Sequence, residues 1–211
     1  MIEVIRIVEH QASLSSYRAT HDEERAVQLE LLIELTKPKN LYPEWDFLIA
    51  TPFRYNPPYS KARFRPPFAK RNVFYGALAE ETALYEHAYH FMRERLHLNV
   101  EPEMGVRTLF HVDADERGSI HIRQYSDYQK MLDKQDYSAS HQFVEKNPHV
   151  TFILYPSCRD PKQRDNAAIL DIHHLEKKTK SETSIKFFYN YKKKQLTWID
   201  SQLHVHWEQV R

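Results

Sequence analysis

Glycine is scarce in this chain, which contains three glycines among 211 residues. A P-loop and a glycine-rich dinucleotide-binding turn each need several glycines at short spacing, so the sequence excludes both. A phosphate-bearing ligand would therefore have to be held by side chains. Arginine suits that task because its planar guanidinium can meet two phosphate oxygens at once.

Cysteine and long apolar runs are scarce as well. A single cysteine, Cys158, excludes an internal disulfide framework and agrees with a reducing compartment. No apolar run reaches the ~18 residues of a membrane helix, and the segment MIEVIRIVEHQ lacks the apolar core of a signal peptide. We expect a cytoplasmic protein without a membrane segment. Because no histidine pairs with Cys158 in a recognisable motif, we interpret it as a small residue beside a strand end.

Net charge is small, at +1, so nothing steers the whole chain toward nucleic acid. Residues 176–194, EKKTKSETSIKFFYNYKKK, are locally basic, and their aromatic side chains could stack on bases. A strand with solvated lysines is the more usual meaning of such a pattern. His204 and His206 would lie on one side of a strand and could share a metal ion, but no carboxylate or cysteine stands beside them, and we predict no metal site.

Hydrophobic periodicity predicts an α+β fold, with helices mainly in the first half and strands mainly in the second. In the first half we expect a strand over residues 2–9, a helix over 26–35 that ends before Pro38, and a strand near 73–75 leading into a helix from about Glu80. In the second half we expect a helical segment within 126–147 and strands within the segments 106–114, 119–125, 149–157, 166–174 and 183–200.

The segment TPFRYNPPYSKARFRPPF, residues 51–68, has no apolar period of helix or strand. It carries Arg54, Arg63 and Arg65 together with Tyr55, and five prolines fix its backbone. A stiff segment loses little entropy when it binds a ligand. We therefore interpret residues 51–68 as an extended, preorganised clamp for a phosphate-bearing ligand; the alternative is a surface crossover with solvated arginines.

Five blocks in order, PFRYNPP, ARFRPPF, NVFYGALAEETALYE, DYSASHQ and ILYPSCRDP, resemble the RES domain family over about residues 50–175. This resemblance implies an ADP-ribosyltransferase-like fold and destruction of NAD by phosphorolysis or hydrolysis of its nicotinamide–ribose bond. It also implies a bacterial toxin whose partner is a helix-turn-helix antitoxin. Two departures from the family pattern are the lack of a glycine within SKARF and the residues KQRD after RDP, where glycines often follow.

The resemblance assigns roles to eight residues. Arg54, Glu86 and Ser138 would be catalytic, with the Glu86 carboxylate stabilising positive charge on the ribose. Tyr55, Arg63, Tyr75, Ser140 and Ser157 would bind NAD, and the functional serine is left open among Ser138, Ser140 and Ser157. Glu86 by itself, from helical spacing, would be a solvated glutamate opposite the apolar face.

The expected organisation is an N-terminal extension over residues 1–49, a catalytic region over 50–175 and a basic β extension over 176–211 on the same domain. NAD, with inorganic phosphate as a second substrate in the phosphorolytic version, is the expected ligand, and no cofactor is expected to be permanently bound. Direct binding of nucleic acid is not expected, and a homo-oligomer is left open. Transfer of ADP-ribose to a macromolecule and a non-catalytic nucleotide-binding module are the alternatives.

Overall fold

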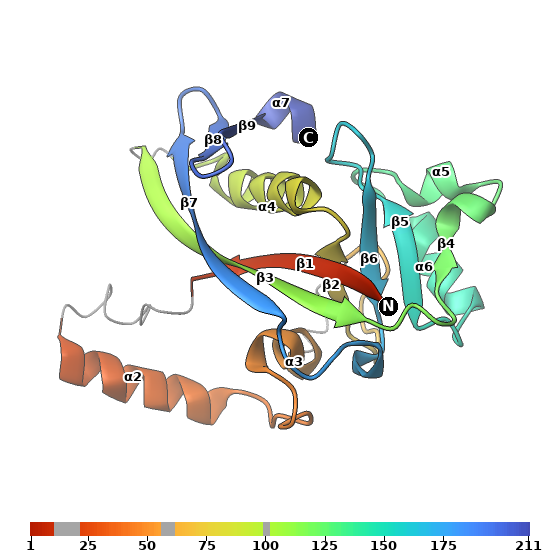
Figure 1. The fold of residues 1–211 in the computed structure, drawn as a ribbon, viewed down its shortest axis with the longest axis horizontal. Helices are drawn as coiled ribbons and strands as arrows, with labels where there is room; N and C mark the ends of the chain where they lie inside the picture. The colour runs from red at the N-terminus through yellow and green to blue at the C-terminus, as the bar shows by residue number, and fades with distance from the viewer. Residues whose placement is uncertain (11–21, 56–61, 99–101) are drawn as a thin grey trace.

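The computed structural model describes residues 1–10, 22–55, 62–98 and 102–211, and within them the chain forms one mixed sheet flanked by helices (Figure 1). The strand order is β4-β5-β6-β2-β1-β3-β7-β8-β9; β4 and β5 run parallel, and the other neighbours run antiparallel. The strands are β1 (Ile2–Glu9), β2 (Phe74–Ala77), β3 (Glu103–Ala114), β4 (Ile120–His121), β5 (Phe152–Pro156), β6 (Asp165–Ile169), β7 (Ser181–Asn190), β8 (Gln195–Trp198) and β9 (Leu203–His206). The helices are α2 (Glu23–Thr36), α3 (Phe47–Arg54), α4 (Glu80–Arg95), α5 (Tyr128–Met131), α6 (Ser138–Lys146) and α7 (Trp207–Val210), with 3-10 turns η1 (Ile122–Gln124) and η2 (Ile172–His174).

Strand β1 lies in the middle of this sheet. It pairs with β3 along its whole length and with β2 through Ile5 and Ala77. Successive side chains on a strand point to opposite faces. Val4 accordingly packs in the cluster beneath α3, whereas Ile5 packs in the cluster beneath α4. The two helices thus cover opposite faces of the central strands (Figure 1).

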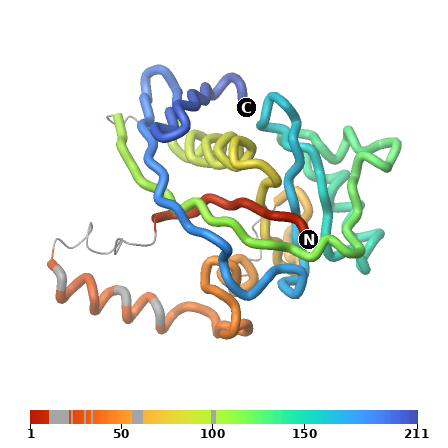
Figure 2. The backbone as a smooth tube through the Cα atoms, in the orientation of Figure 1, coloured from red at the N-terminus to blue at the C-terminus, as the bar shows by residue number. Residues whose placement is uncertain are grey.

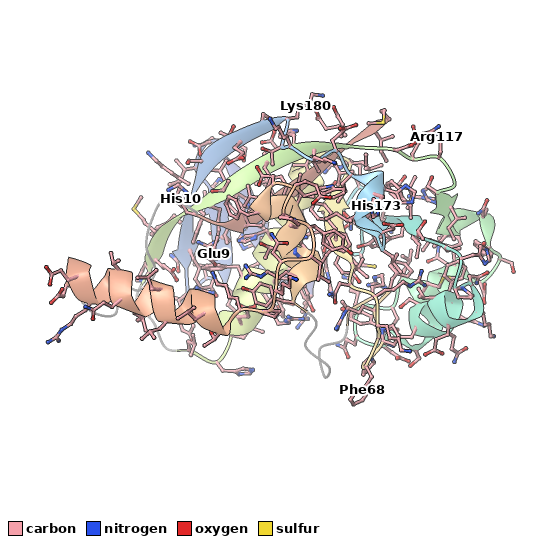
Figure 3. All side chains as sticks on the ribbon, turned by 90° about the horizontal axis from the view of Figure 1, so that it is seen from below. Glu9, His10, Phe68, Arg117, His173 and Lys180 are labelled. Atoms are coloured by element: carbon pink, nitrogen blue, oxygen red, sulfur yellow. The ribbon has the colours of Figure 1, made fainter. Side chains whose placement is uncertain are left out.

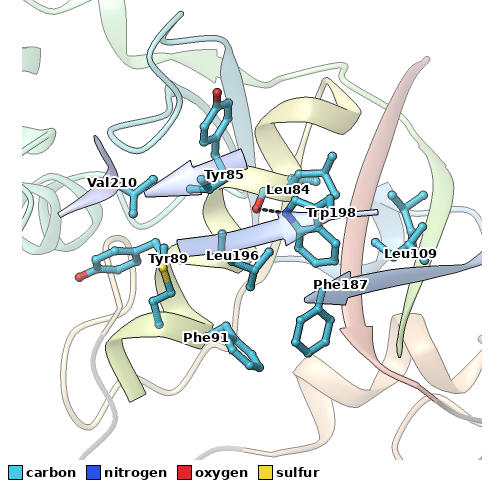
Figure 4. Close-up of a cluster of buried hydrophobic side chains, with 14 of the residues drawn as sticks. Leu84, Tyr85, Tyr89, Phe91, Leu109, Phe187, Leu196, Trp198 and Val210 are labelled. Carbon is cyan, nitrogen blue, oxygen red and sulfur yellow. Dashed lines mark hydrogen bonds between the residues drawn. The ribbon is translucent and has the colours of Figure 1, made fainter. Parts of the chain in front are cut away.

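The core beneath α4 is dominated by aromatic residues. Figure 4 shows Phe91 of α4 against Phe187 of β7, with Trp198 of β8 beside them. The Trp198 Nε1–H donates to the carbonyl of Leu84 at 3.3 Å, so this buried indole has a partner. Edge-on aromatic pairs such as Phe91 and Phe187, whose ring centres are 4.8 Å apart, are a favourable packing geometry. The second half of the chain therefore supplies the surface on which α4 rests.

A separate apolar cluster lies beneath α5 and α6 and includes Phe64, Phe143 and Tyr155. Tyr75 of β2 packs against this cluster, while Ala77 belongs to the cluster beneath α4. Residues two apart on a strand face the same side. Both clusters therefore lie on the same face of the sheet, and β2 runs between them.

Several predicted elements are confirmed. Helix α2 covers the predicted helix and ends before Pro38, α4 begins at Glu80, and β1 covers residues 2–9 as expected. The prediction for residues 119–125 was too long, because the strand is confined to Ile120–His121 and the chain then enters η1. Helix α2 lies apart from the sheet (Figure 2), with exposed Leu31, Leu32 and Leu35.

The extended clamp predicted for residues 51–68 is wrong at its start. Residues 51–54 form the last turn of α3, which contains Pro52. Asp46 begins this helix, since its side chain accepts from the Leu48 N–H at 2.8 Å. Residues 56–61 lie outside the described part. At the far end, Phe68 has a φ of 60° and projects away from the body of the protein (Figure 3).

No helix in the described residues is long and apolar enough to cross a membrane.

Candidate active site

A cavity of about 340 Å³ opens on the sheet face that carries both apolar clusters. Its volume falls at the lower end of the range for small-molecule sites. Helix α4 and strands β1 and β2 form one wall, and the residues around the β5–β6 connection form another. Its polar and aromatic lining residues are Arg6, Arg63, Tyr75, Glu86, His87, Tyr89, His90, Arg93, Tyr137, Tyr155, Cys158, Arg159 and Asn166.

Glu86 is the one carboxylate among the described lining residues, and it is half-buried. Its Oε1 accepts two hydrogen bonds, from the Ser157 hydroxyl at 2.6 Å and from the Asn166 side-chain amide at 2.7 Å. Ser157 follows β5 directly and Asn166 lies on β6, so neighbouring strands hold a carboxylate supplied by α4. No hydrogen bond from the described residues reaches Oε2. Glu86 thus has one oxygen fixed by the protein and one left for a ligand.

The Ser157 hydroxyl is itself fixed by the backbone. Its oxygen accepts from the N–H groups of Arg159 at 3.1 Å and of Asp160 at 3.0 Å. With those two donors on the oxygen, the hydroxyl hydrogen is directed to Glu86. Ser157 is therefore a polarised donor rather than a free nucleophile in this arrangement.

Positive charge surrounds this single carboxylate. Arg6, Arg63, Arg93 and Arg159 all line the cavity, and none of them forms an ion pair within the part of the chain that is described. Arg159 instead donates to the backbone carbonyls of Val210 at 2.6 Å and Lys134 at 2.9 Å. Guanidinium groups without carboxylate partners leave a positive potential in a concave site. Such a cavity favours an anionic ligand.

Arg6 of β1 has a buried hydrogen-bond donor in addition to lacking an ion pair among the described residues. Its Nη1 is buried and has no hydrogen-bond partner among the described residues, and burial lowers the pKa of its guanidinium to about 10. Its charged head lies 4.8 Å from the centre of the Phe74 ring. A buried donor without a partner is costly, by about 1–3 kcal/mol. Asn166 is similar, because its Oδ1 is a buried hydrogen-bond acceptor that has no partner among the described residues.

Tyrosines form the apolar part of the wall. Burial raises the pKa of Tyr75 and of Tyr155, so both phenols are neutral at physiological pH. The Tyr75 hydroxyl accepts from the backbone N–H of Phe64 at 3.2 Å, which ties β2 to the segment that carries Arg63. The Arg63 guanidinium in turn lies 5.0 Å from the centre of the Tyr137 ring. These rings give the cavity flat surfaces suited to a planar ligand group.

Two histidines on α4 also line the cavity, and both are poorer bases than usual. Burial, followed by repulsion from Arg107, lowers the pKa of His87 to about 3. Its Nε2 accepts from the Arg107 Nε–H at 3.2 Å, so the ring hydrogen is on Nδ1. Burial also lowers the pKa of His90, although Glu86 opposes the shift. Burial likewise raises the pKa of the Cys158 thiol, which donates to the Leu132 carbonyl.

Of the eight predicted site residues, Arg63, Tyr75 and Glu86 line this cavity, and a fourth, Ser157, donates a hydrogen bond to Glu86. Helical spacing alone predicted that Glu86 faces solvent, and this is wrong, because the cavity lies on that side of α4.

The other four predicted residues lie elsewhere. Arg54 ends α3 and donates to the Pro38 carbonyl, with Tyr55 next to it. Ser138 is exposed and bonded to Asp136. Ser140 is buried and donates to the carbonyls of Arg63 and Tyr137, which supports the backbone at Arg63 without reaching the cavity.

Reasoning from the sequence missed Arg6, Arg159 and Asn166. Arg159 stands within the family block ILYPSCRDP, and an arginine in such a block is a usable signal of an anion-binding residue. Asn166 opens a predicted strand, and a polar residue at the buried end of an apolar strand is a usable signal. Arg6 had a similar signal, since it interrupts the apolar residues of β1.

Groups of three or more possible metal ligands are absent from the described residues. His204 Nδ1 lies 3.0 Å from the Thr197 hydroxyl, and His206 caps α7. In the basic segment, Phe187 and Tyr189 are fully buried beneath α4, and this pair is therefore not available to stack on bases.

A protein-family model matches this chain over most of its length. A search of curated proteins finds no match. The family model of the RES domain matches residues 37–189, which include most of the chain and every residue that lines the cavity except those of β1. The chain therefore belongs to the RES domain family.

Proposed function

We propose that this protein destroys NAD by cleaving the bond between nicotinamide and ribose. The observation that carries the proposal is the fixed carboxylate of Glu86 within a cavity that is otherwise cationic and aromatic. RES domains are generally associated with toxin–antitoxin systems and are compatible with an NAD-related enzymatic role. An ADP-ribosyltransferase-like fold, a cytoplasmic location and a role as the toxin are parts of the same proposal.

Cleavage of the nicotinamide–ribose bond requires few catalytic groups. Nicotinamide leaves with the electron pair of its C–N bond, and because its ring is cationic in NAD it departs neutral without a general acid. The ribose develops oxocarbenium character, as in glycoside cleavage. The Oε2 of Glu86 would accept a hydrogen bond from a ribose hydroxyl, and the carboxylate charge would stabilise the transition state. Phosphate or water then forms the new bond to the ribose carbon.

The arginines would hold the anionic part of the substrate. Arg63 and Arg159 lie fixed on the wall by backbone carbonyls and aromatic rings, so their positions are set before a ligand arrives. Arg6 would supply the unpartnered Nη1. These groups would bind the pyrophosphate of NAD, or an inorganic phosphate that attacks the ribose. Arg54, which lies outside the cavity, has no part in this version of the mechanism.

The remaining polar and aromatic groups would orient the two rings. The rings of Tyr75 and Tyr155 would pack against the nicotinamide and exclude water. The unpartnered Oδ1 of Asn166 would accept from a ligand donor such as a ribose hydroxyl or the nicotinamide amide. A helix-turn-helix antitoxin is the partner we propose; any contact with DNA would be made through it.

The test is the loss of NAD over time, with purified protein, for wild type and Glu86→Gln, in buffer with and without phosphate. Glu94→Gln is the matched control, since it makes the same change on an exposed part of the same helix. Wild type and Glu94→Gln should release nicotinamide, and Glu86→Gln should be slower by about 100-fold, as for removal of one transition-state contact.

The reaction products distinguish phosphorolysis, hydrolysis and ADP-ribosyl transfer. ADP-ribose-1″-phosphate that appears only with phosphate indicates phosphorolysis, and free ADP-ribose in both buffers indicates hydrolysis. Nicotinamide release that requires an added macromolecule indicates ADP-ribosyl transfer. Folded wild type that binds NAD without releasing nicotinamide would contradict the proposal in favour of a binding module.

A further inference from the structure

The loop between β5 and β6, residues 157–164, is attached to the first turn of α4 by an ionic cluster that lies outside the cavity and is centred on a buried carboxylate. The Asp160 side chain is fully buried and accepts from the Thr82 hydroxyl at 2.7 Å and from the Arg164 Nε at 2.6 Å. Arg164 also donates through Nη1 to Glu81 at 2.5 Å. We refer to Glu81, Thr82, Asp160 and Arg164 as the loop clamp.

Within the loop clamp, the buried Asp160 carboxylate accepts several hydrogen bonds. Burial is the largest influence on the Asp160 carboxyl and would raise its pKa, but the hydrogen bonds from Arg164 and Thr82 together lower it. Arg164 Nη2 and the Lys162 N–H add two further donors. A buried ion pair persists only where hydrogen bonds satisfy both partners in this way. Asp160 is therefore ionised and held from both the helix and the loop.

The loop clamp is connected to Glu86 by one short path. The backbone N–H of Asp160 donates to the Ser157 hydroxyl, and that hydroxyl donates to Glu86 Oε1. The turn that carries these groups is closed by a bond from the Gln163 N–H to the Asp160 carbonyl, with Gln163 at a φ of 49°. A non-glycine residue rarely adopts this backbone conformation, so contacts elsewhere must hold the turn.

We propose that the loop clamp is a positioning device for Glu86: by holding the 157–164 turn against α4, it keeps the Ser157 hydroxyl directed at the carboxylate. Asp160 and Thr82 are positioning residues, because neither lines the cavity. This inference rests on the proposed NAD cleavage for its kinetic consequence. Its geometric consequence, the bond between Ser157 and Glu86, stands independently of the reaction.

The principal test is Asp160→Asn, with NAD cleavage and thermal unfolding measured on the same preparation. We expect kcat to fall by about tenfold, since small displacements of a catalytic group are costly, while KM changes by less than about twofold because the arginines are untouched. Thr82→Val should lower kcat in the same direction by less. Thr82→Ser keeps the hydroxyl and should restore the wild-type kcat.

Two outcomes would overturn the inference. The first is an unchanged kcat in Asp160→Asn; if the melting temperature falls at the same time, Asp160 has a structural role only. The second is equal losses of kcat in Thr82→Val and Thr82→Ser, since such losses would not depend on the hydroxyl that both the wild type and Thr82→Ser keep.

A different result would contradict the proposed function itself: wild-type protein that releases no nicotinamide from NAD. In that case the crystal structure of Asp160→Asn decides the geometry. A Ser157 hydroxyl turned away from Glu86 supports the loop clamp, and an intact bond between them overturns it.

Discussion

At the scale of single residues, the cavity combines groups that stabilise the fold with groups that weaken it. The buried Nη1 of Arg6 and the Oδ1 of Asn166 have no partners among the described residues, which is unfavourable unless a ligand supplies them. Tyr75 and Ser140, in contrast, use their hydroxyls to hold the backbone near Arg63. A preorganised binding site is expected to have polar atoms without hydrogen-bond partners where the ligand binds, and fully hydrogen-bonded side chains around them.

His87 provides a pH prediction at this scale. Its pKa is about 3 in the folded protein, far below the ordinary value of 6.5, because burial and Arg107 disfavour the charged ring. As pH falls below about 6.5 the unfolded chain takes up a proton that the folded chain does not, so the free energy of unfolding falls. Between pH 7 and pH 5 this loss is about 2 kcal/mol.

The comparison is with His87→Gln, whose side-chain oxygen can still accept from Arg107 but does not titrate. Urea unfolding of both proteins at pH 7, 6 and 5 should give a steeper decline for wild type. Parallel declines would mean that His87 titrates alike in the folded and unfolded states.

At the scale of elements, the contact between β3 and β7 depends on a missing side chain. Gly105 pairs directly with Phe187, and a Cβ at Gly105 would lie 2.4 Å from the tip of that ring. The ring is completely buried against Phe91 and Trp198, so it has little room to move. Glycine at this position thus lets the aromatic ring lie across β3 and reach α4.

Gly105→Ala should therefore lower the free energy of unfolding by about 1–3 kcal/mol, the usual effect of overpacking a core. Phe187→Leu in the same chain should recover part of that loss, because the shorter side chain leaves room for the methyl group. Chemical denaturation of the two single variants and the double variant gives the coupling energy. Simple additivity would show that the ring is not the obstacle.

At the scale of the whole molecule, β1 is the strand that joins the two halves of the sheet. It lies between β2 and β3, and residues 2–9 pair with β3 along their length. The family match begins at residue 37, so β1 lies outside it, although β1 contributes Arg6 to the cavity. The expected division at residues 49 and 175 stays a prediction, but β1 and β7 are continuous with the sheet that carries the site.

A chain that lacks residues 1–10 should consequently fail to fold. Its β2 and β3 would have no strand between them, and their unpaired edges and the apolar surface under Val4 and Ile5 would be exposed. Circular dichroism and amide NMR dispersion, measured beside the full chain, check this. Cooperative thermal unfolding of the shortened chain would show that the two halves hold together without β1.

Local sequence patterns were enough to predict most helices and strands and the types of side chain available to the site. Alternating apolar residues indicated β1 and β7, the residues before Pro38 indicated α2, and the block from Tyr75 to Glu86 indicated a strand followed by a helix with a carboxylate. Periodicity and proline placement act over a few residues, and the five family blocks could be read in order. Helix α3 was not predicted, because the five prolines of residues 51–68 favour an extended backbone, whereas Pro52 lies inside the helix that Asp46 caps.

Which of those side chains lie next to one another follows from the folded chain and not from any local pattern. Arg6 and Glu86 are 80 positions apart, and Ser157 lies 71 positions from Glu86. Their proximity depends on strand order and on the turn after β5, neither of which leaves a local pattern. Three serines looked alike in the sequence, and the pairing of β5 with β6 placed Ser157 against the carboxylate while Ser138 stayed exposed. Side-chain type is local information, whereas position in a site is set by long-range pairing and packing.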